Sequence, residues 1–385
     1  MKTITLSDVS VNGRGYYGIG ASAVPFSDDL YTYLRITDIN DDGTLNMADL
    51  KSVDDEKACE YLLQPNDIVF ARTGASTGRN YFYDGSDGKF VYAGFLIKFS
   101  IDPSKINPKY VKYFCLSQQY KDWIHSFNTG STRGNINAQT LGKMPIPELE
   151  REKQDALVEI LSSIDAKIKQ NNAINENLAV LLQTVYQERF GDVDIAAKQG
   201  VLSDICSYSK DRVAVSELDV TTYFSTENML PRKAGSSDAT SLPTTPQTTA
   251  CHKGDTLISN IRPYFKKIVY CEDECGCSTD VLCFTPNQPQ YSAYLFSTLY
   301  ADKFFAFMVA GAKGTKMPRG DKQQIMTYPI VFPSEVALVE FNTIALPLIK
   351  QIYSNRAENK RLSLLRDTLL PKLMSGELDV SDIDL

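Results

Sequence analysis

The sequence predicts an α+β protein of two similar half-units, each an α+β domain followed by one long helix. Three observations lead to this prediction. Part of the chain repeats at an offset of 184 residues, residues 148–190 contain neither proline nor glycine, and the remaining segments alternate short β-rich runs with Gly, Asn and Pro turns. A repeat of this length indicates one structural unit that occurs twice. The boundaries that we expect are 1–147 and 193–333 for the α+β domains, 148–192 and 334–376 for the helical spacers, and 377–385 for an acidic tail.

The repeat is clearest where each α+β segment ends. GSTRGNINAQTLGKMPI (130–146) corresponds to GTKMPRGDKQQIMTYPI (314–330), and the same offset holds without a gap to the end of the chain. Upstream the similarity is looser, as between PNDIVFAR (65–72) and KGDTLISN (253–260). The offset drifts there, which indicates loop insertions between two otherwise equivalent units.

The α+β segments contain short runs of residues that favour strands. These runs are DIVFA, KFVYAGFLIKF, TLIS, KIVYC and VLCF. Gly, Asn and Pro separate them, as is typical of strands joined by turns. Amphipathic stretches at 108–127 and 290–308 suit short helices. We therefore expect each segment to fold as a mixed domain.

The two spacer segments carry a heptad pattern, in which the seam positions alternate in steps of four and three. The seam positions are Leu157, Leu161, Ile164, Ile168, Asn171, Asn175, Leu178, Leu182 and Val185 in the first copy, and Phe341, Ala345, Leu348, Ile352, Asn355, Asn359, Leu362, Arg366 and Leu369 in the second. Two such helices in one chain are expected to pair with each other as an antiparallel coiled coil.

Polar residues interrupt the middle of this seam in both copies, at Asn171, Asn175, Asn355 and Asn359. A buried seam Asn lowers stability but fixes the register and the partner of a helix. The alternative is a solvated Asn on the flank of the helix, and the pattern leaves both interpretations open.

Two prolines bear on the second helix. Pro347 is expected to kink it or to start a new helix, because proline lacks the backbone donor and clashes with the preceding turn. Pro371 is expected to end the helix near Gly376, which suits a C-terminal cap.

Composition limits the class of protein. The chain has 385 residues, 43% hydrophobic and 23% charged, which excludes wholesale disorder. The longest apolar runs are far shorter than the ~18–20 residues that a membrane span needs, and MKTITLSDVS lacks the apolar core of a secretory signal. The eight Cys are irregularly spaced, so we expect reduced thiols in a cytoplasmic protein without a membrane partner.

Catalytic motifs are missing from the sequence. There is no [DN]-P-P-[FYW] motif, no Gly-rich S-adenosylmethionine loop and no GxxxxGK[ST], and the only two His are His125 and His252. Cys271, Cys275, Cys277 and Cys283 have irregular spacing, unlike the CxxC pairs of zinc sites. Reduced thiols on a β-hairpin are therefore favoured over zinc, and the chain is expected to be non-catalytic.

Loops rich in basic and small residues are the candidate binding elements. Arg can fork onto guanine, and hydroxyls and amides can bond phosphate or base edges. Such residues follow the DIVFA strand in ARTGASTGRN and occur at the equivalent point in SNIRPYFKK, and GSTRGN and GAKGTKMPRG precede each helix. The candidate DNA-binding residues are Arg72, Thr73, Ser76, Thr77, Arg79, Asn260, Arg262, Tyr264, Lys266, Arg35, Ser131, Thr132, Arg133, Lys313 and Lys316. Taken singly, each loop could also be a solvated turn.

These motifs resemble the specificity (S) subunit of Type I restriction–modification systems. YLRITDIN, QPNDIVFARTGASTGR, KGDTLISNIRPYFKKI, STENMLP and LLPKLMSGEL occur in family order over almost the whole chain. The resemblance implies that 1–147 and 193–333 are target recognition domains, each for one half of a bipartite double-stranded DNA site, and that the coiled coil is the spacer. It also implies two docked modification subunits that bring S-adenosylmethionine for adenine-N6 methylation, and restriction subunits, if present, that use ATP and Mg. No cofactor is expected in this chain.

Two alternatives stay open. The same architecture could serve a related system whose partner fuses methyltransferase and nuclease, or the chain could be a coiled-coil scaffold that binds only proteins. The net charge of −7 suits tight DNA binding poorly. We therefore expect tight binding to need the modification subunits.

Overall fold

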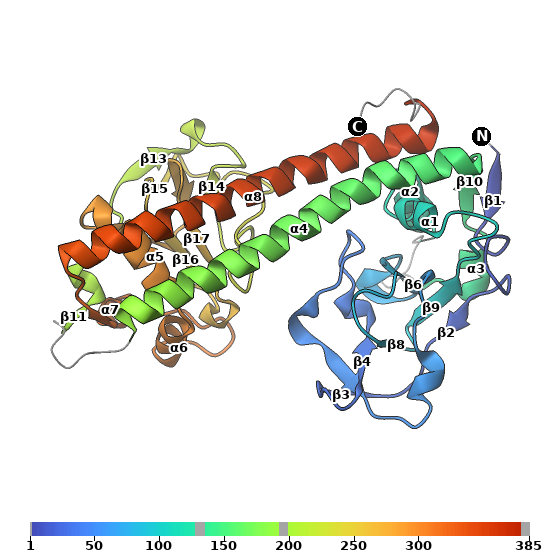
Figure 1. Cartoon of the computed structure of the whole chain (residues 1–385), viewed down its shortest axis with the longest axis horizontal. Coiled ribbons are helices and arrows are strands. Elements are labelled where there is room, and N and C mark those ends of the chain that lie inside the picture. Colours follow the sequence, from blue (N-terminus) through green and yellow to red (C-terminus); the bar gives the residue numbers. More distant parts are fainter. Residues whose placement is uncertain (1, 128–134, 192–198, 379–385) are drawn as a thin grey trace. The chain divides into compact units, whose positions relative to one another are not determined.

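A computed structural model describes residues 2–127, 135–191 and 199–378 of the chain (Figure 1). The chain divides into two units, Met1–Ile168 with Arg361–Leu385, and Lys169–Lys360. Each unit contains one α+β domain and a part of each of two long helices. The predicted fold class, α+β domains with two long helices, is confirmed.

The first unit contains two four-stranded sheets. The antiparallel sheet has the order β2 (Tyr16–Tyr17), β9 (Leu96–Ser100), β6 (Asp67–Ala71) and β7 (Asn80–Tyr83). The mixed sheet has the order β3 (Ala23–Pro25), β5 (Lys51–Val53), β4 (Tyr31–Leu34) and β8 (Phe90–Tyr92), with β4 and β8 parallel. β1 (Thr3–Thr5) pairs with β10 (Pro145–Pro147). The short helices are α1 (Pro108–Phe114), α2 (Gln118–His125) and α3 (Ala138–Gly142).

The second unit repeats this arrangement. Its antiparallel sheet has the order β12 (Cys206–Tyr208), β19 (Val281–Pro286), β16 (Thr256–Ser259) and β17 (Ile268–Tyr270). Its mixed sheet has the order β13 (Arg212–Ala214), β15 (Gln247–Cys251), β18 (Cys275–Cys277) and β14 (Tyr223–Phe224). β11 (Gln199–Val201) pairs with β20 (Pro329–Val331). The short helices are α5 (Ser292–Tyr300), α6 (Asp302–Ala310) and α7 (Lys322–Met326).

The two domains match element by element in chain order, and the antiparallel sheets have the same strand order. α3 and α7 begin 184 residues apart, as do β10 and β20, so the offset read from the sequence holds in the structure. The mixed sheets differ, because β4 lies inside its sheet whereas its equivalent β14 lies at the edge.

Two long helices complete the units, α4 (Arg151–Phe190) and α8 (Glu335–Ser375). In the first unit the core that holds Phe99 and Tyr113 also holds Leu161 of α4 and Leu373 of α8. In the second unit Phe190 of α4 packs edge-on against Phe341 of α8, with ring centroids 5.3 Å apart. Apolar faces thus join both helices to each domain core.

The expectation that Pro347 could start a new helix is wrong, because α8 is one helix from Glu335 to Ser375, whereas its end directly before Gly376 is where the sequence placed it, four residues after Pro371. Each proline removes one backbone hydrogen bond, but apolar burial beside it holds the helix, with Ala345 and Ile349 buried around Pro347. Gly376 has a φ of +72° directly after the last helical residue, and its N–H donates to Leu373 O at 3.3 Å. It is therefore the predicted cap.

Within the part of the chain that the structure describes, α8 is the one helix long and apolar enough to cross a membrane by length and composition. Core helices of soluble proteins pass the same test. Phe341, Ala345 and Ile349 of α8 are buried in a protein core, and 28% of the apolar window is buried in all.

Candidate nucleic-acid interface

The loop that follows strand β6 in the first domain, residues 72–79, is closed on itself. Ala71 N–H donates to Arg79 O at 2.8 Å, and Gly78 N–H donates back to Ala71 O at 2.9 Å. Thr77 Oγ1 donates to Gly74 O at 2.8 Å, and Ser76 is buried. The hydroxyls of this first strand-end loop therefore help to shape it.

Two of the predicted basic residues in this domain are paired with acids. Arg79 makes a two-pronged contact with Asp41, with Nε–Oδ1 at 2.7 Å and Nη2–Oδ2 at 3.1 Å. Arg35 contacts Asp38 in the same way, at 3.0 and 2.6 Å. The hydrogen bonds that Arg35 donates to Asp38 raise the pKa of Arg35, and its partial burial opposes this shift. Both guanidinium groups lie at the predicted site but are occupied within the protein.

Arg72 differs from these two arginines. Its guanidinium carbon lies 5.0 Å from the ring centroid of Tyr17, and its Nε is buried without a hydrogen-bond partner among the described residues. The backbone N–H of Arg72 donates to Phe95 O at 3.0 Å, and the Phe95 side chain is 60% exposed. Arg72, Tyr17 and Phe95 therefore form a basic and aromatic cluster at the end of β6.

The loop that precedes α3 adjoins this cluster. Thr73 forms a bridge with Asn135, and Ile136 N–H donates to Arg72 O at 2.9 Å. The chain thus brings Asn135, the last residue of the GSTRGN motif, beside the first strand-end loop. The predicted residues Ser131, Thr132 and Arg133 lie outside the described residues.

The second domain has the same arrangement after strand β16. Arg262 N–H donates to Pro318 O at 2.8 Å, and Gly320 N–H donates to Asn260 O at 3.3 Å, so the loop 311–320 adjoins the second strand-end loop, residues 260–266. The Asn260 side chain is buried, and its Oδ1 has no partner among the residues that the structure describes. The equivalent loops therefore meet in both domains.

Aromatic and basic side chains are exposed on the second strand-end loop. Tyr264 is half exposed, and its ring lies 4.8 Å from that of Phe265. Lys266 Nζ contacts Asp302 Oδ1 at 2.8 Å. Base-stacking aromatics beside cationic groups are typical of nucleic-acid surfaces.

The predicted lysines of loop 311–320 are both exposed. Lys313 contacts Asp321 at 2.5 Å, and the hydrogen bond from Lys313 holds the pKa of Asp321 below its usual range. For Lys316 no ion pair is found within the described ranges. Arg319 was not predicted, yet it forms a bridge with Ile261 and contacts Asp280 at 3.0 Å.

Sequence reasoning missed Tyr17, Phe95 and Arg319. Arg319 lies in a basic stretch that carried a signal. Tyr17 and Phe95 carried none, because β2 and β9 bring them to Arg72 from distant parts of the chain. The DNA-binding roles of all these residues remain predictions.

The predicted seam asparagines meet in reciprocal pairs within the second unit. Asn171 Nδ2 donates to Asn359 Oδ1 at 2.9 Å, and Asn355 Nδ2 donates to Asn175 Oδ1 at 2.9 Å. Asn171 also donates to Glu358 Oε2 at 2.8 Å. Asn171, Asn175 and Asn355 are buried, so these three are not the solvated residues of the alternative interpretation. Their role in fixing the register stays a prediction.

Five cysteines share one hydrophobic cluster in the second domain, namely Cys251, Cys271, Cys275, Cys277 and Cys283. Cys271 and Cys275 Sγ lie 3.6 Å apart. Over residues 2–127, 135–191 and 199–378, no group of three or more His, Cys, Asp or Glu is arranged to hold a metal ion. His252 instead contacts Glu274 and Asp211, and these hydrogen bonds raise its pKa.

Comparison with known proteins extends this picture. Residues 28–179 match the family model of the Type I restriction modification DNA specificity domain. The chain is 34% identical over 76 residues to the Type I restriction enzyme MjaIX specificity subunit of Methanocaldococcus jannaschii, a match that covers 20% of this chain and 18% of that protein. It is 20% identical over 197 residues to the Type I restriction enzyme HindI specificity subunit of Haemophilus influenzae, which covers 49% and 43%. The matches span less than half the length of either relative.

The fold has a counterpart among solved structures. The crystal structure of a Type I restriction–modification system S subunit from M. genitalium gives a TM-score of 0.58 at 16% identity, over 97% of this chain and 95% of that one. At this identity the likeness concerns the fold. The family resemblance inferred from the sequence is confirmed.

Proposed function

The chain carries a Type I restriction modification DNA specificity domain at residues 28–179, and from this premise we propose that it is the non-catalytic DNA-recognition subunit of a Type I restriction–modification complex. The family match is the observation that carries this proposal. The pairing of basic and aromatic loops at equivalent strand ends supports it. No cofactor is assigned to this chain.

Each domain reads one half of a bipartite DNA site. The support is the duplication of the site, with one strand-end loop after β6 and the other after β16. The loops differ in sequence, ARTGASTGR against NIRPYFK, so the two half-sites differ. One chain with two unlike readers suits an asymmetric target, whereas a homodimer suits a palindrome.

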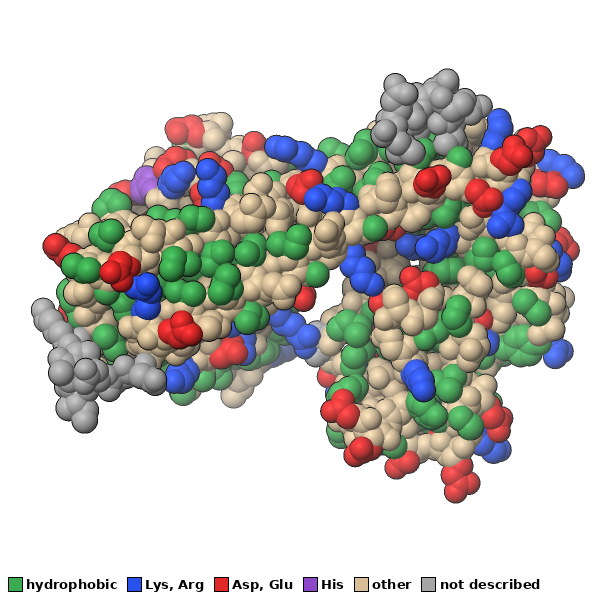
Figure 2. Space-filling view, in the orientation of Figure 1, with side chains coloured by type: hydrophobic (Ala, Val, Ile, Leu, Met, Phe, Trp, Pro, Cys, Tyr) green, Lys and Arg blue, Asp and Glu red, His purple; other side chains and the backbone are tan. Residues whose placement is uncertain are grey.

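The long helices set the gap between the half-sites and dock two modification subunits. Exposed apolar side chains on α4 and α8 support docking, among them Val180, Val336 and Leu364, and Figure 2 shows hydrophobic side chains on the exposed surface of the chain. Exposed apolar side chains that cluster on a surface are typical of protein interfaces. The modification subunits supply S-adenosylmethionine for adenine-N6 methylation, and restriction subunits, where present, supply ATP and Mg chemistry.

Tight DNA binding needs these partners. The chain has a net charge of −7, and acids occupy Arg79 and Arg35 beside the candidate interface. Few cations remain to neutralise phosphates, which supply much of the affinity of DNA-binding proteins. A gel-shift titration of the lone chain should therefore give weak binding, and nanomolar specific binding would contradict this part of the proposal.

A genome-wide map of N6-methyladenine tests the proposal as a whole. The gene is expressed with its neighbouring modification gene, and the control cells lack this gene. We expect a two-part motif with a fixed gap that appears only with this chain, and exchange of residues 1–145 for those of a relative should change one half of it. An active partner without any motif that depends on this chain would favour the protein-scaffold alternative. The neighbouring gene itself tells whether methyltransferase and nuclease are fused.

The role of Arg72 has a matched control. Arg14 lies 5.0 Å from the ring of Tyr16, just as Arg72 lies 5.0 Å from the ring of Tyr17. Arg72→Ala should cost about 1–3 kcal/mol if the side chain is bidentate to guanine, and specificity should relax in one half-site only. Arg14→Ala should leave both half-sites unchanged. Equal effects of the two substitutions would contradict the assignment.

A further inference from the structure

Left-handed backbone at non-glycine residues is concentrated in one place of the second unit. Within the described ranges five such residues have positive φ, and four of them are basic, namely Arg232 at +58°, Lys233 at +64°, Arg262 at +50° and Lys266 at +52°. This conformation is costly for residues with a Cβ, and it persists only where surrounding contacts enforce it. Strain of this kind clusters at functional sites.

Arg232 and Lys233 both donate to the backbone of the second strand-end loop. Arg232 N–H donates to Phe265 O at 2.7 Å, and Lys233 N–H donates to Lys266 O at 2.9 Å. The turn 229–236, closed by a bridge between Met229 and Ser236, therefore holds the second strand-end loop through its backbone.

Asp302 adds a side-chain tie between the same two elements. Its Oδ1 accepts from Lys233 Nζ and from Lys266 Nζ, both at 2.8 Å. The Lys233 ammonium also lies 4.6 Å from the ring centroid of Tyr300. The two strained lysines are thus fixed to one carboxylate at the start of α6.

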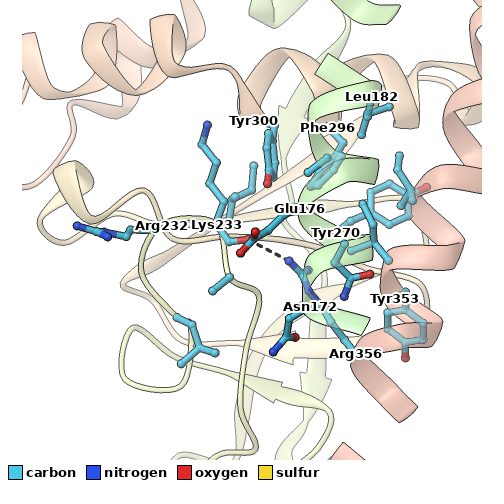
Figure 3. A pocket seen from close by; sticks show the side chains of 17 residues that line it. Asn172, Glu176, Leu182, Arg232, Lys233, Tyr270, Phe296, Tyr300, Tyr353 and Arg356 are labelled. Carbon is cyan, nitrogen blue, oxygen red and sulfur yellow. Dashed lines mark hydrogen bonds between the residues drawn. The ribbon is translucent and has the colours of Figure 1, made fainter. Parts of the chain in front are cut away.

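One residue of a long helix completes the chain of contacts. Arg356 of α8 donates from Nη2 to Lys233 O at 3.0 Å, and Figure 3 shows it reaching toward the segment that carries Lys233. The guanidinium lies directly on Gly235, where an added Cβ would come within 2.9 Å of Arg356 Cζ. A hydrogen-bonded path therefore runs from α8 through Lys233 to Lys266 of the second strand-end loop.

Packing around this path is loose. A cavity of about 420 Å³ separates the turn from the helices, and its wall includes Arg356, Lys233, Phe296 and Tyr300 (Figure 3). Close side-chain packing therefore does not hold the turn against α8. A further polar contact between α8 and this region is an exposed ion pair of Lys360 with Asp238 at 2.6 Å, and exposed pairs contribute little.

No acid balances the charge of Arg356. The structure gives it no ion pair within the described ranges, and burial lowers its pKa, with an opposing contribution from Tyr300 alone. A half-buried cation that lacks a carboxylate partner does little for stability by itself. The hydrogen bond from Arg356 to Lys233 O is therefore the polar interaction that the guanidinium makes at this position.

We infer that Arg356 is a positioning residue for target recognition by the second domain. Through Lys233 it holds the second strand-end loop in its left-handed conformation, so that Arg262, Tyr264 and Lys266 meet DNA in one arrangement. The inference rests on the proposed function and adds to it a residue on the spacer helix that governs specificity in one half-site.

The test uses the complete complex with its modification subunits and three variants, Arg356→Met, Arg356→Lys and the control Lys360→Gln. Methylation rates are measured on the cognate site and on sites altered at single positions of either half. The loss of a charged hydrogen bond corresponds to roughly a tenfold to hundredfold change. We expect Arg356→Met to relax discrimination on that order in the half-site of the second domain and to leave the other half unchanged. Arg356→Lys should restore part of it, and Lys360→Gln should change neither half.

Hydrogen exchange on the lone chain gives a second readout that needs no DNA. The amides of Arg232 and Lys233 should exchange faster in the Arg356→Met variant, while the amides of α8 on either side stay protected. A uniform loss of protection in Arg356→Met would indicate that this variant unfolds. In that case the exchange of the Arg232 and Lys233 amides in the milder Arg356→Lys variant tests the inference. Protected amides at Arg232 and Lys233 in both Arg356 variants, or unchanged specificity, would overturn the inference. A wild-type complex without sequence-dependent methylation would instead defeat the proposed function.

Discussion

The asparagine pair at the centre of the helices allows a quantitative prediction. Asn355 is 5% exposed and Asn175 is 8% exposed, and the Asn355 amide donates to Asn175 Oδ1 at 2.9 Å. Asn355→Leu removes this donor and leaves the Asn175 oxygen without a protein partner. The unpaired group costs about 1–3 kcal/mol, and burial of the added apolar surface returns about 1 kcal/mol. We expect a net loss of up to about 2 kcal/mol.

The double variant Asn175→Leu/Asn355→Leu should behave differently from the sum of its parts. Both buried polar groups are gone, the exposed Gln351 that donated to Asn355 can turn to solvent, and the two leucines extend the apolar seam. We expect stability equal to that of the wild type or greater, so that the coupling between the positions is at least as large as the summed losses of the two single variants.

Hydrogen exchange of α4 and α8 amides in the full chain measures this coupling, because it gives local opening free energies without a two-state assumption for the whole molecule. A double variant whose loss equals the summed losses of the single variants would refute the reasoning. A matched control is Leu364→Asn on the exposed face of α8, which should change the opening free energy by less than about 0.5 kcal/mol.

Three further predictions concern other contacts. Asp165→Asn should destabilise the first unit by about 1–3 kcal/mol in urea unfolding, because Arg366 loses its partially buried carboxylate partner; an unchanged midpoint would contradict this. The contact with Glu274 raises the pKa of His252, so its stabilisation is complete below the unfolded pKa of about 6.5 and is lost as the pH rises through the higher folded value. His252→Gln should thus lower the free energy of unfolding at pH 6 by less than about 1 kcal/mol, because the pair is exposed, and should not lower it at pH 9. A larger loss at pH 9 than at pH 6 would contradict the prediction. Pro347→Ala should stabilise α8 by up to about 3 kcal/mol, because alanine restores the backbone donor. A thermal melt should show this as a higher midpoint, and an unchanged or lower midpoint would contradict it.

Much of the fold could be predicted from local patterns. The repeat offset located α7, β20 and the start of α8, because sequence similarity requires no knowledge of packing. The heptad pattern placed Leu161 and Phe341 in buried positions. Pro347 does not start a new helix as the local rule for proline allowed, because that rule omits the burial that holds a long helix together on both sides of it.

The candidate site was harder to predict, because partners distant in sequence decide what each basic residue does. Arg79 is bound by Asp41, 38 residues earlier. Arg72 lies on the ring of Tyr17, because strands β2, β9 and β6 are neighbours in one sheet. Arg35 and Asp38 are only three residues apart, yet spacing alone does not tell an ion pair from two exposed charges. Side-chain pairing depends on strand register, and no local motif encodes it.

The exchanged strands of the mixed sheets limit how the two domains can be recombined. In both domains the antiparallel sheet has the same neighbours, so a segment of one can be grafted onto the other without breaking a ladder. In the mixed sheets β5 pairs with β4, whereas β15 pairs with β18 instead of β14. A chimera joined inside a mixed sheet would place strands beside neighbours with the wrong register, while one joined within α4 keeps every sheet intact. Evolution by shuffling of whole domains is therefore compatible with this fold, and shuffling of half-sheets is not.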